Sequence, residues 1–186
     1  NYKEAFMRIK PENTIAIAVD YQTRLVPAMS NIRELIHNSS ILLRGLSVLE
    51  VPIILTQQYT KGLGETVPEI LSAAGDCPIF DKITFSCYQD EAIRDAVRAS
   101  GRKTVLLCGI EAHVCVLQTV IDLLEDGCQV VLVCDCIDSR KPSDKAAALI
   151  RARQEGAIIT SCEAILFELT QIAGNARFKE ISRLVK

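Results

Sequence analysis

Apolar runs of strand length alternate with stretches of helical periodicity along almost the whole chain of 186 residues. Uninterrupted aliphatic runs such as TIAIAV, TVLLCGI and QVVLV suit parallel strands, which are covered on both faces. Between these runs, hydrophobic residues recur every three or four positions, as expected for amphipathic helices. This β-α-β-α order indicates an α/β protein with a doubly wound, mostly parallel sheet and helices on both faces.

The expected strands are 14–20, 51–56, 78–86, 104–110, 128–135 and 156–161. The expected helices are 31–50, 89–99, 114–125, 143–155, 162–171 and an amphipathic segment over 176–185. Residues 57–78 are rich in Gly, Pro and polar side chains, so we interpret them as a long surface loop with room for one helical turn. Without an internal repeat or linker, residues 1–186 are expected to form one domain.

Composition excludes several classes of protein. The net charge is −2 and no cluster of Lys and Arg stands out, which argues against a nucleic-acid surface. No apolar run approaches the roughly 20 residues that span a bilayer. The N-terminal NYKEAFMRIKPEN is polar and mixed in charge, so we expect no signal peptide and a cytoplasmic location. We expect the eight cysteines to be reduced rather than to form a disulfide framework, because several lie in aliphatic runs.

Cys115 is the candidate nucleophile. A buried strand ends near Gly109, a short turn follows, and a helix is expected to begin around Cys115. The unpaired N–H groups and positive dipole at a helix start favour the reactive thiolate, and they also suit an oxyanion. The competing interpretation is a buried cysteine that only fills space.

Two charged residues at strand ends are candidate partners of this thiol. Asp20 ends the first apolar run, where a carboxylate is costly to bury without a partner, and it could act as a general base. Lys82 lies in an otherwise apolar run and could hold Cys115 as thiolate and Asp20 as carboxylate. The alternatives are a strand-end capping carboxylate and an exposed edge-strand lysine.

Other polar residues near the same strand ends are candidates for lining a substrate pocket: Gln22, Gln58, Tyr59 and His113. His113 precedes Cys115 by two positions, where side chains tend to point apart, so we favour pocket lining over direct proton transfer. The two histidines, 76 positions apart, do not form a zinc-binding pattern, and the glycines of KGLGETVPE match no nucleotide-binding motif. We therefore expect neither a metal nor another cofactor.

Three dispersed motifs resemble the isochorismatase-like cysteine hydrolase superfamily over about residues 12–170. They are an Asp ending the first strand in AIAVDYQ, a Lys in FDKITFSCY and a Cys in GIEAHVCV. Within the superfamily, LTQQYTKGLGETVPEI and LLCGIEAHVCVLQTVIDLLEDG are most similar to the isochorismatase-domain-containing subgroup.

The resemblance implies a three-layer αβα fold with a six-stranded parallel sheet and a catalytic triad of Cys115, Asp20 and Lys82. It also implies a cis peptide between Ile110 and Glu111, with the N–H groups of Glu111 and Cys115 forming an oxyanion hole. Members of the superfamily commonly form homo-oligomers, so a dimer or tetramer is expected.

The chain departs from the superfamily pattern after the second strand. Nicotinamidases bind a metal there through Asp and His, whereas TQQYTKGLGETVPE has no histidine, which argues against a metal and against nicotinamide as substrate. The leading hypothesis is a metal-independent hydrolase of a small amide, ureido or related carbonyl compound, acting through a thioester. The alternatives are a vinyl-ether hydrolase that uses Asp20 as acid, and a binding or scaffold protein with little turnover.

Overall fold

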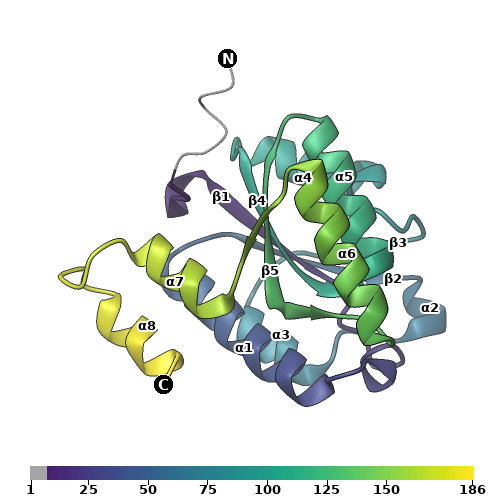
Figure 1. The fold of residues 1–186 in the computed structure, drawn as a ribbon, viewed down its shortest axis with the longest axis horizontal. Helices are drawn as coiled ribbons and strands as arrows, with labels where there is room; N and C mark the ends of the chain where they lie inside the picture. Colours follow the sequence, from purple (N-terminus) through teal and green to yellow (C-terminus); the bar gives the residue numbers. More distant parts are fainter. Residues whose placement is uncertain (1–7) are drawn as a thin grey trace.

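A computed structural model describes residues 8–186 and contains a six-stranded sheet in which every strand pair is parallel (Figure 1). The strands are β1 (Thr14–Val19), β2 (Ile53–Gln58), β3 (Ile79–Lys82), β4 (Thr104–Ile110), β5 (Gln129–Asp138) and β6 (Ile158–Thr160). Their order, β3-β2-β1-β4-β5-β6, places the switch point of a doubly wound fold between β1 and β4. The predicted α/β fold is confirmed. The N-terminal residues 1–7, which belong to the segment where we expect no signal peptide, lie outside the described residues.

Helices cover both faces of the sheet, which gives three layers (Figure 1). One face is covered by α1 (Ile32–Val48), α3 (Pro68–Ala74), α7 (Cys162–Thr170) and α8 (Phe178–Leu184). The other is covered by α4 (Glu91–Ala99), α5 (Leu117–Glu125) and α6 (Pro142–Glu155). A short helix, α2 (Thr60–Leu63), follows β2. Every helix within residues 8–186 is too short or too polar to cross a bilayer.

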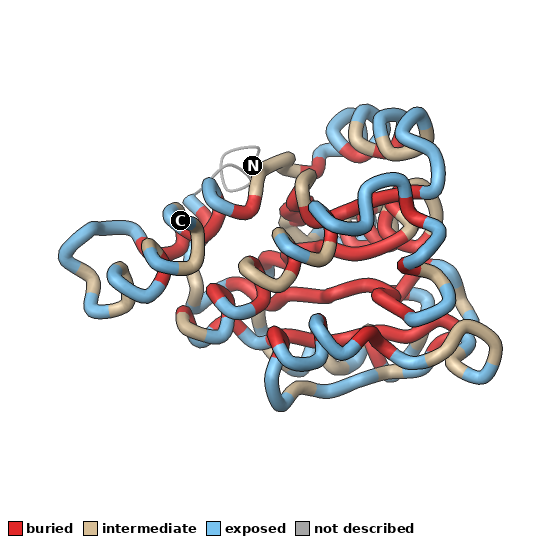
Figure 2. The backbone as a smooth tube through the Cα atoms, turned by 90° about the horizontal axis from the view of Figure 1, so that it is seen from below, coloured by how far each residue is buried: buried red, intermediate tan, exposed pale blue. Residues whose placement is uncertain are grey.

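The sheet separates two hydrophobic cores, and alternate residues of β1 face each of them. Ala16 and Ala18 belong to the core under α1, whereas Ile15, Ile17 and Val19 belong to the core under α4, α5 and α6. Figure 2 shows the strands buried along the middle of the molecule, with exposed residues on the outer sides of the helices. This burial on both faces explains why the strands are continuous aliphatic runs.

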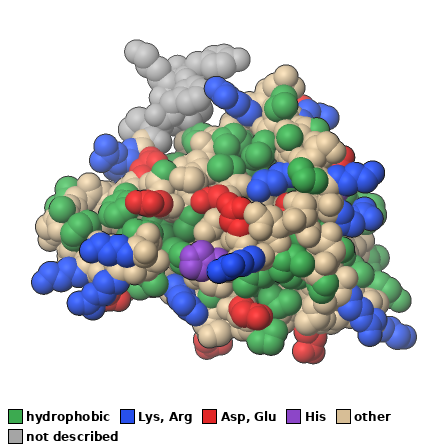
Figure 3. Space-filling model, turned by 60° about the horizontal axis from the view of Figure 1, so that its bottom comes forward, with side chains coloured by type: hydrophobic (Ala, Val, Ile, Leu, Met, Phe, Trp, Pro, Cys, Tyr) green, Lys and Arg blue, Asp and Glu red, His purple; other side chains and the backbone are tan. Residues whose placement is uncertain are grey.

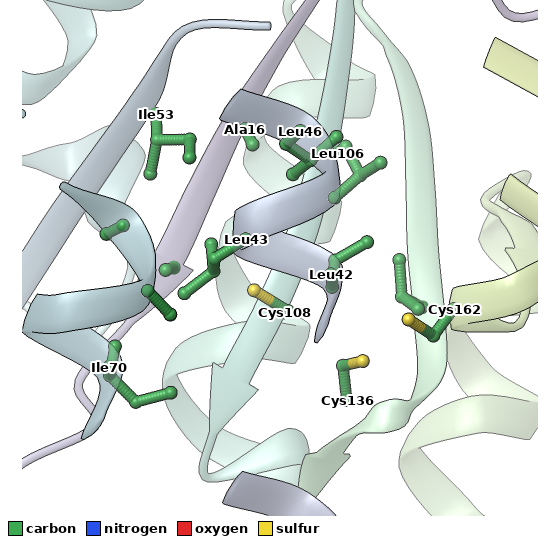
Figure 4. Packing of buried hydrophobic residues seen from close by; sticks show 14 of the residues in the cluster. Ala16, Leu42, Leu43, Leu46, Ile53, Ile70, Leu106, Cys108, Cys136 and Cys162 are labelled. Atoms are coloured by element: carbon green, nitrogen blue, oxygen red, sulfur yellow. The ribbon is translucent and has the colours of Figure 1, made fainter. Parts of the chain in front are cut away.

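The core under α1 contains leucines of the helix and three cysteines, as Figure 4 shows. Cys108, Cys136 and Cys162 are among the eight cysteines of the chain, all of which are free thiols. They pack as small hydrophobic side chains in this core, which is their usual role when buried and unreactive.

Local capping signals set several helix boundaries. The side chain of Asn31 accepts a hydrogen bond from Glu34 N–H at the start of α1, and Asp90 accepts one from Ile93 N–H at the start of α4. Helix α6 ends at Gly156, whose left-handed backbone is a common helix terminator.

Three predicted segments differ from the structure. Residues 57–78 contain two helices, α2 and α3, because Pro68 opens a second helix that buries Ile70 against α1. Strand β3 ends at Lys82 rather than at residue 86, because its only partner, β2, ends opposite at Gln58. Strand β5 continues to Asp138, past the predicted end at 135, because a register shift against β4 lets pairing resume at Ile137.

Candidate active site

The candidate residues converge at the carboxyl ends of the central strands. Asp20 directly follows β1, Gln58 ends β2, Lys82 ends β3 and Cys115 follows β4. In the register of the sheet, Gln58 pairs with Lys82 and Val19 pairs with Gly109. Parallel strands end at the same edge of the sheet, so residues far apart in sequence meet beside the switch point, where doubly wound folds bind ligands.

Asp20 is fully buried and its carboxylate accepts hydrogen bonds from several donors. Oδ1 accepts from Thr56 Oγ1 at 2.8 Å, and Oδ2 accepts from Lys82 Nζ at 3.0 Å. The backbone of Asp20 is left-handed, with φ of 53°, a conformation that Asp tolerates better than most residues. The turn after β1 thus places the Asp20 side chain within hydrogen-bonding distance of Thr56 and Lys82.

Lys82 is buried, and its ammonium has four acceptors. Besides Asp20, Nζ donates to Gln58 Oε1 at 2.6 Å and to the carbonyl oxygens of Thr84 and Phe85, both at 3.0 Å. Burial alone would lower the pKa of Lys82, but the surrounding acidic groups, Asp20 among them, outweigh burial and raise that pKa above its usual value. Lys82 is therefore a cation at neutral pH, and its burial contradicts the alternative of an exposed edge-strand lysine.

Cys115 lies in a π-helical turn, Ala112–Val116, which continues directly into α5. The turn is π-helical because Val116 N–H donates to the carbonyl of Glu111, five residues earlier, at 3.2 Å. The side chain is almost buried, with 7 % exposure, and the Cys115 carbonyl accepts from Thr119 Oγ1 at 2.7 Å. The thiol is thus in the first turn of a continuous helical segment, as the sequence indicates.

The protonation state of the thiol differs from the sequence-based expectation of a stabilised thiolate. Burial raises the pKa of Cys115 well above its usual value, the charge of Asp20 raises it further, and Lys82 only partly counteracts them. A hydrogen bond to Asp20 also raises it. The raised pKa favours the protonated thiol beside Asp20, an arrangement in which the proton can pass from sulfur to the Asp20 side chain during attack.

Two predicted pocket residues have their amides engaged within the protein. Gln22 is fully buried and its side chain bonds the backbone: Oε1 accepts from Gln58 N–H at 2.6 Å, and Nε2 donates to the carbonyls of Gln58 and Gly64. The Gln58 amide donates from Nε2 to the Ile83 carbonyl at 2.9 Å and accepts from Lys82 through Oε1. The structure thus brings Gln58 into the charged cluster and uses Gln22 to join β1 to the segment after β2.

The other two predicted pocket residues lie near the surface. Tyr59 is half exposed, and its ring packs over Gly62, where an added side chain would clash with it. His113 Nδ1 is 2.9 Å from Ser139 Oγ, and its two ring nitrogens are 3.9 Å and 3.7 Å from the carboxylates of Glu111 and Asp144. The polar neighbours of His113 thus belong to the turn and to the segments after β5, and its role as pocket lining stays a prediction.

The peptide bond between Ile110 and Glu111 is cis, as the family resemblance implies. The Glu111 carboxylate accepts from the backbone N–H and the side chain of Arg140, each at 3.1 Å. This ion pair fastens the segment after β5 onto the turn that carries Cys115.

Two residues around the site were missed by the sequence analysis. Thr56 holds Asp20 and lies 3.7 Å from the sulfur of Cys87, which is fully buried and whose pKa is raised to about 11, chiefly by burial. Thr56 is a polar residue at the end of the apolar run VPIILT, which is a usable signal. No local sequence pattern marks Cys87, because the residues that contact it, Thr56 and Thr119, are distant in sequence. Within residues 8–186, no three His, Cys, Asp or Glu side chains are grouped as metal ligands.

Comparison with known proteins identifies the family from the sequence. The isochorismatase domain family model matches residues 14–164. A secreted isochorismatase effector of Phytophthora sojae is 40% identical, over 96% of this chain and 87% of its own length. Isochorismatase domain-containing protein 2A of Mus musculus is 38% identical, over 96% of this chain and 85% of its own length.

Two solved structures are similar over almost the whole chain. The MAR1 ribonuclease from Caenorhabditis elegans is 38% identical, with a TM-score of 0.91, covering 96% of this chain and 92% of that one. YcaC from Pseudomonas aeruginosa, solved with hexane-2,5-diol and covalent acrylamide, is 25% identical, with a TM-score of 0.89, covering 95% and 90%. The family predicted from three motifs is thus confirmed: this chain belongs to the isochorismatase-like hydrolases.

Proposed function

We propose that this chain hydrolyses a small amide, ureido or related carbonyl compound with Cys115 as nucleophile and Asp20 as proton acceptor. The observation that carries the proposal is the position of Asp20, which bonds the buried ammonium of Lys82 at 3.0 Å and also accepts from the Cys115 thiol. Asp20 lies between the Lys82 ammonium and the Cys115 thiol, so it is suited to accept the proton of the sulfur. The positive charge of Lys82 compensates the negative charge of the buried carboxylate.

The proposed reaction has two stages. As the Cys115 sulfur attacks the carbonyl carbon, its proton passes to Asp20, and the N–H groups of Glu111 and Cys115 stabilise the oxyanion. The C–N bond then breaks, the amine leaves with the proton from Asp20, and a thioester remains on Cys115. Water gives a proton to Asp20 and attacks the thioester, the C–S bond breaks, and the thiol recovers the proton as the acid is released.

Acrylamide is a suitable probe of this site, because YcaC from Pseudomonas aeruginosa carries it covalently. We expect acrylamide to add to Cys115 faster than to the other seven cysteines of the chain. Peptide mapping by mass spectrometry would identify the modified thiol. Cys115→Ser should abolish the fast modification, whereas the matched variant Cys128→Ser, at a half-buried cysteine before β5, should not change it.

An amide and ureide panel then tests the chemistry, with hydroxylamine to trap the thioester. Turnover that disappears in Cys115→Ser supports the proposal. Full activity in Cys115→Ala together with an inactive Asp20→Ala would instead identify a vinyl-ether hydrolase with Asp20 as acid. No turnover and no acyl adduct on any panel member would contradict the hydrolase proposal.

RNA belongs in the same panel because the Caenorhabditis elegans relative is called a ribonuclease. We expect no cleavage by this chain. Its net charge is −2, and on the face that Figure 3 shows, acidic side chains are interspersed among the Lys and Arg side chains. Binding to phosphate backbones depends on a concentration of positive charge.

A further inference from the structure

The side chain of Gln58 makes the shortest contact of the Lys82 ammonium. Gln58 Oε1 lies 2.6 Å from Lys82 Nζ, whereas the Asp20 carboxylate lies at 3.0 Å. Both residues end neighbouring strands and are paired in the register of β2 and β3, so the contact is built into the sheet. A buried amide oxygen and a buried carboxylate thus face the same cation.

The ammonium has more acceptors than donors. A lysine ammonium has three N–H groups. Its acceptors here are four: Asp20, Gln58 and the carbonyls of Thr84 and Phe85. At least one N–H is therefore shared between two acceptors, and a shared hydrogen bond is weaker to each acceptor than an unshared one.

The orientation of the Gln58 amide is determined by its surroundings. Its nitrogen donates to the Ile83 carbonyl at 2.9 Å, so its oxygen must face the ammonium. The backbone of Gln58 is held on both sides by Gln22, at 2.6 Å to its N–H and 2.9 Å to its carbonyl. These contacts fix the orientation of the Gln58 amide, with its oxygen toward the ammonium and its nitrogen toward Ile83.

We propose that Gln58 is a positioning residue that holds the Lys82 ammonium partly away from Asp20, which leaves Asp20 able to accept the Cys115 proton. This inference rests on the proposed role of Cys115 and Asp20. Without Gln58, the ammonium moves closer to Asp20, and the carboxylate becomes a poorer proton acceptor because its charge is more strongly neutralised. The effect reaches the nucleophile through Lys82 and Asp20, not through contact with substrate.

The test is the rate of Cys115 modification by acrylamide as a function of pH. Gln58→Met keeps the side-chain length but removes the amide, and we expect modification at neutral pH to slow about tenfold, the typical effect of one charge-assisted hydrogen bond. We also expect the alkaline limb of the pH profile to move to lower pH, because a more strongly neutralised Asp20 raises the pKa of the Cys115 thiol less. Gln58→Asn, whose amide is too short to reach Nζ, should behave in the same way and serves if the Met variant does not fold.

Gln57 is a matched control next to Gln58. Its amide bonds Thr60 and Thr66, away from the ammonium. Gln57→Met therefore removes buried hydrogen bonds of the same kind, and we expect it to lower stability without moving the pH profile of Cys115 modification. Urea unfolding and circular dichroism would show that the variants being compared are folded.

The possible outcomes separate this inference from the proposed function. Slow modification of Cys115 in wild type would contradict the nucleophile itself, before Gln58 is considered. Fast modification in wild type with unchanged profiles in folded Gln58→Met and Gln58→Asn would overturn the positioning role alone. A raised KM for an amide substrate with an unchanged modification profile would also overturn it, in favour of direct substrate contact by Gln58.

Discussion

Asp20 connects the cation and the thiol of the site, and its replacement gives the clearest prediction at the scale of one residue. Asp20→Asn keeps the shape of the side chain and tolerates the left-handed backbone at φ 53°. It leaves the buried Lys82 ammonium without a carboxylate, so we expect the free energy of unfolding to fall by about 3 kcal/mol. Urea unfolding at neutral pH measures this loss.

Cys115→Ala is the comparison for that experiment. It removes the thiol that bonds Asp20 but leaves the bonds of Asp20 with Lys82 and Thr56 intact. We expect its unfolding free energy to fall by only about 1 kcal/mol, the cost of a small buried side chain. Equal losses in the two variants would show that the buried ion pair does not hold the site together.

Gly109 gives a second residue-scale prediction, because the backbone of Val19 in β1 lies where a side chain at this position would be. An added Cβ would lie 2.1 Å from the Val19 carbonyl oxygen, and the glycine has φ of 120°. We therefore expect Gly109→Ala to cost more than about 3 kcal/mol of unfolding free energy. Thermal unfolding compared with wild type measures it.

Gly101→Ala is the matched control for backbone conformation. Gly101 also has a positive φ, 67°, but an added Cβ would meet nothing within 4 Å. Its expected cost is about 1–2 kcal/mol, the strain of a left-handed alanine alone. If both variants lost the same stability, close strand packing at Gly109 would not be the cause.

At the scale of elements, the side chain of Gln22 connects the segment after β2 to the turn after β1. The amide of Gln22 bonds the backbone of Gln58 and Gly64, and Thr23 N–H donates to Glu65. Gln22→Met should therefore loosen residues 59–66, and we expect their amides to exchange with solvent about tenfold faster. Hydrogen exchange followed by mass spectrometry would resolve this segment.

The central strands provide the internal reference in the same experiment. Amides of β4 and β5 are held by pairing across the sheet, away from Gln22, so their exchange should stay close to wild type. Faster exchange throughout the sheet would mean that Gln22 supports the whole fold rather than this one segment.

Local sequence pattern predicts some helices of this fold better than others. The boundaries of α4 were predicted within two residues, because Asp90 caps one end and Ser100-Gly101 ends the other. Residues 57–78 were predicted as a loop with at most one helical turn, yet α2 and α3 form there. Their stability comes from contacts such as Ile70 against α1, and short sequences do not reveal such contacts.

At the scale of the whole molecule, buried thiols predict a loss of stability at alkaline pH. Burial raises the pKa of Cys87 from 9.0 to about 11 and that of Cys108 from 9.0 to about 12. Between pH 9 and 10 these thiols stay protonated in the folded protein but ionise in the unfolded chain. The unfolded state is therefore favoured as pH rises, by about 0.7 kcal/mol per pH unit for each thiol near pH 9 and by up to about 1.4 kcal/mol per pH unit above it.

Urea unfolding at pH 8, 9 and 10 measures this dependence. Cys108→Ala removes one of the contributing thiols, so we expect its stability to fall less steeply with pH, although its cavity lowers stability at every pH. A wild-type curve that is flat from pH 8 to 10 would contradict the assignment of these thiols as protonated in the fold.

Three properties of this chain stay predictions: its homo-oligomeric state, its single-domain organisation and its cellular location. The expected homo-oligomer rests on the family resemblance, and sedimentation equilibrium would test it. A cytoplasmic location is expected for this chain, whereas the Phytophthora sojae relative is described as a secreted effector.

The sequence alone determined the alternation of strands and helices, the family, and the places of Asp20, Lys82 and Cys115 at strand ends. These features depend on local periodicity and on motifs that can be read along the chain. Tertiary structure decided that Gln58 bonds Lys82, and that burial raises the pKa of the Cys115 thiol. Hydrogen-bond partners and burial arise from residues distant in sequence, and they determine pKa values and amide orientations that no local pattern contains.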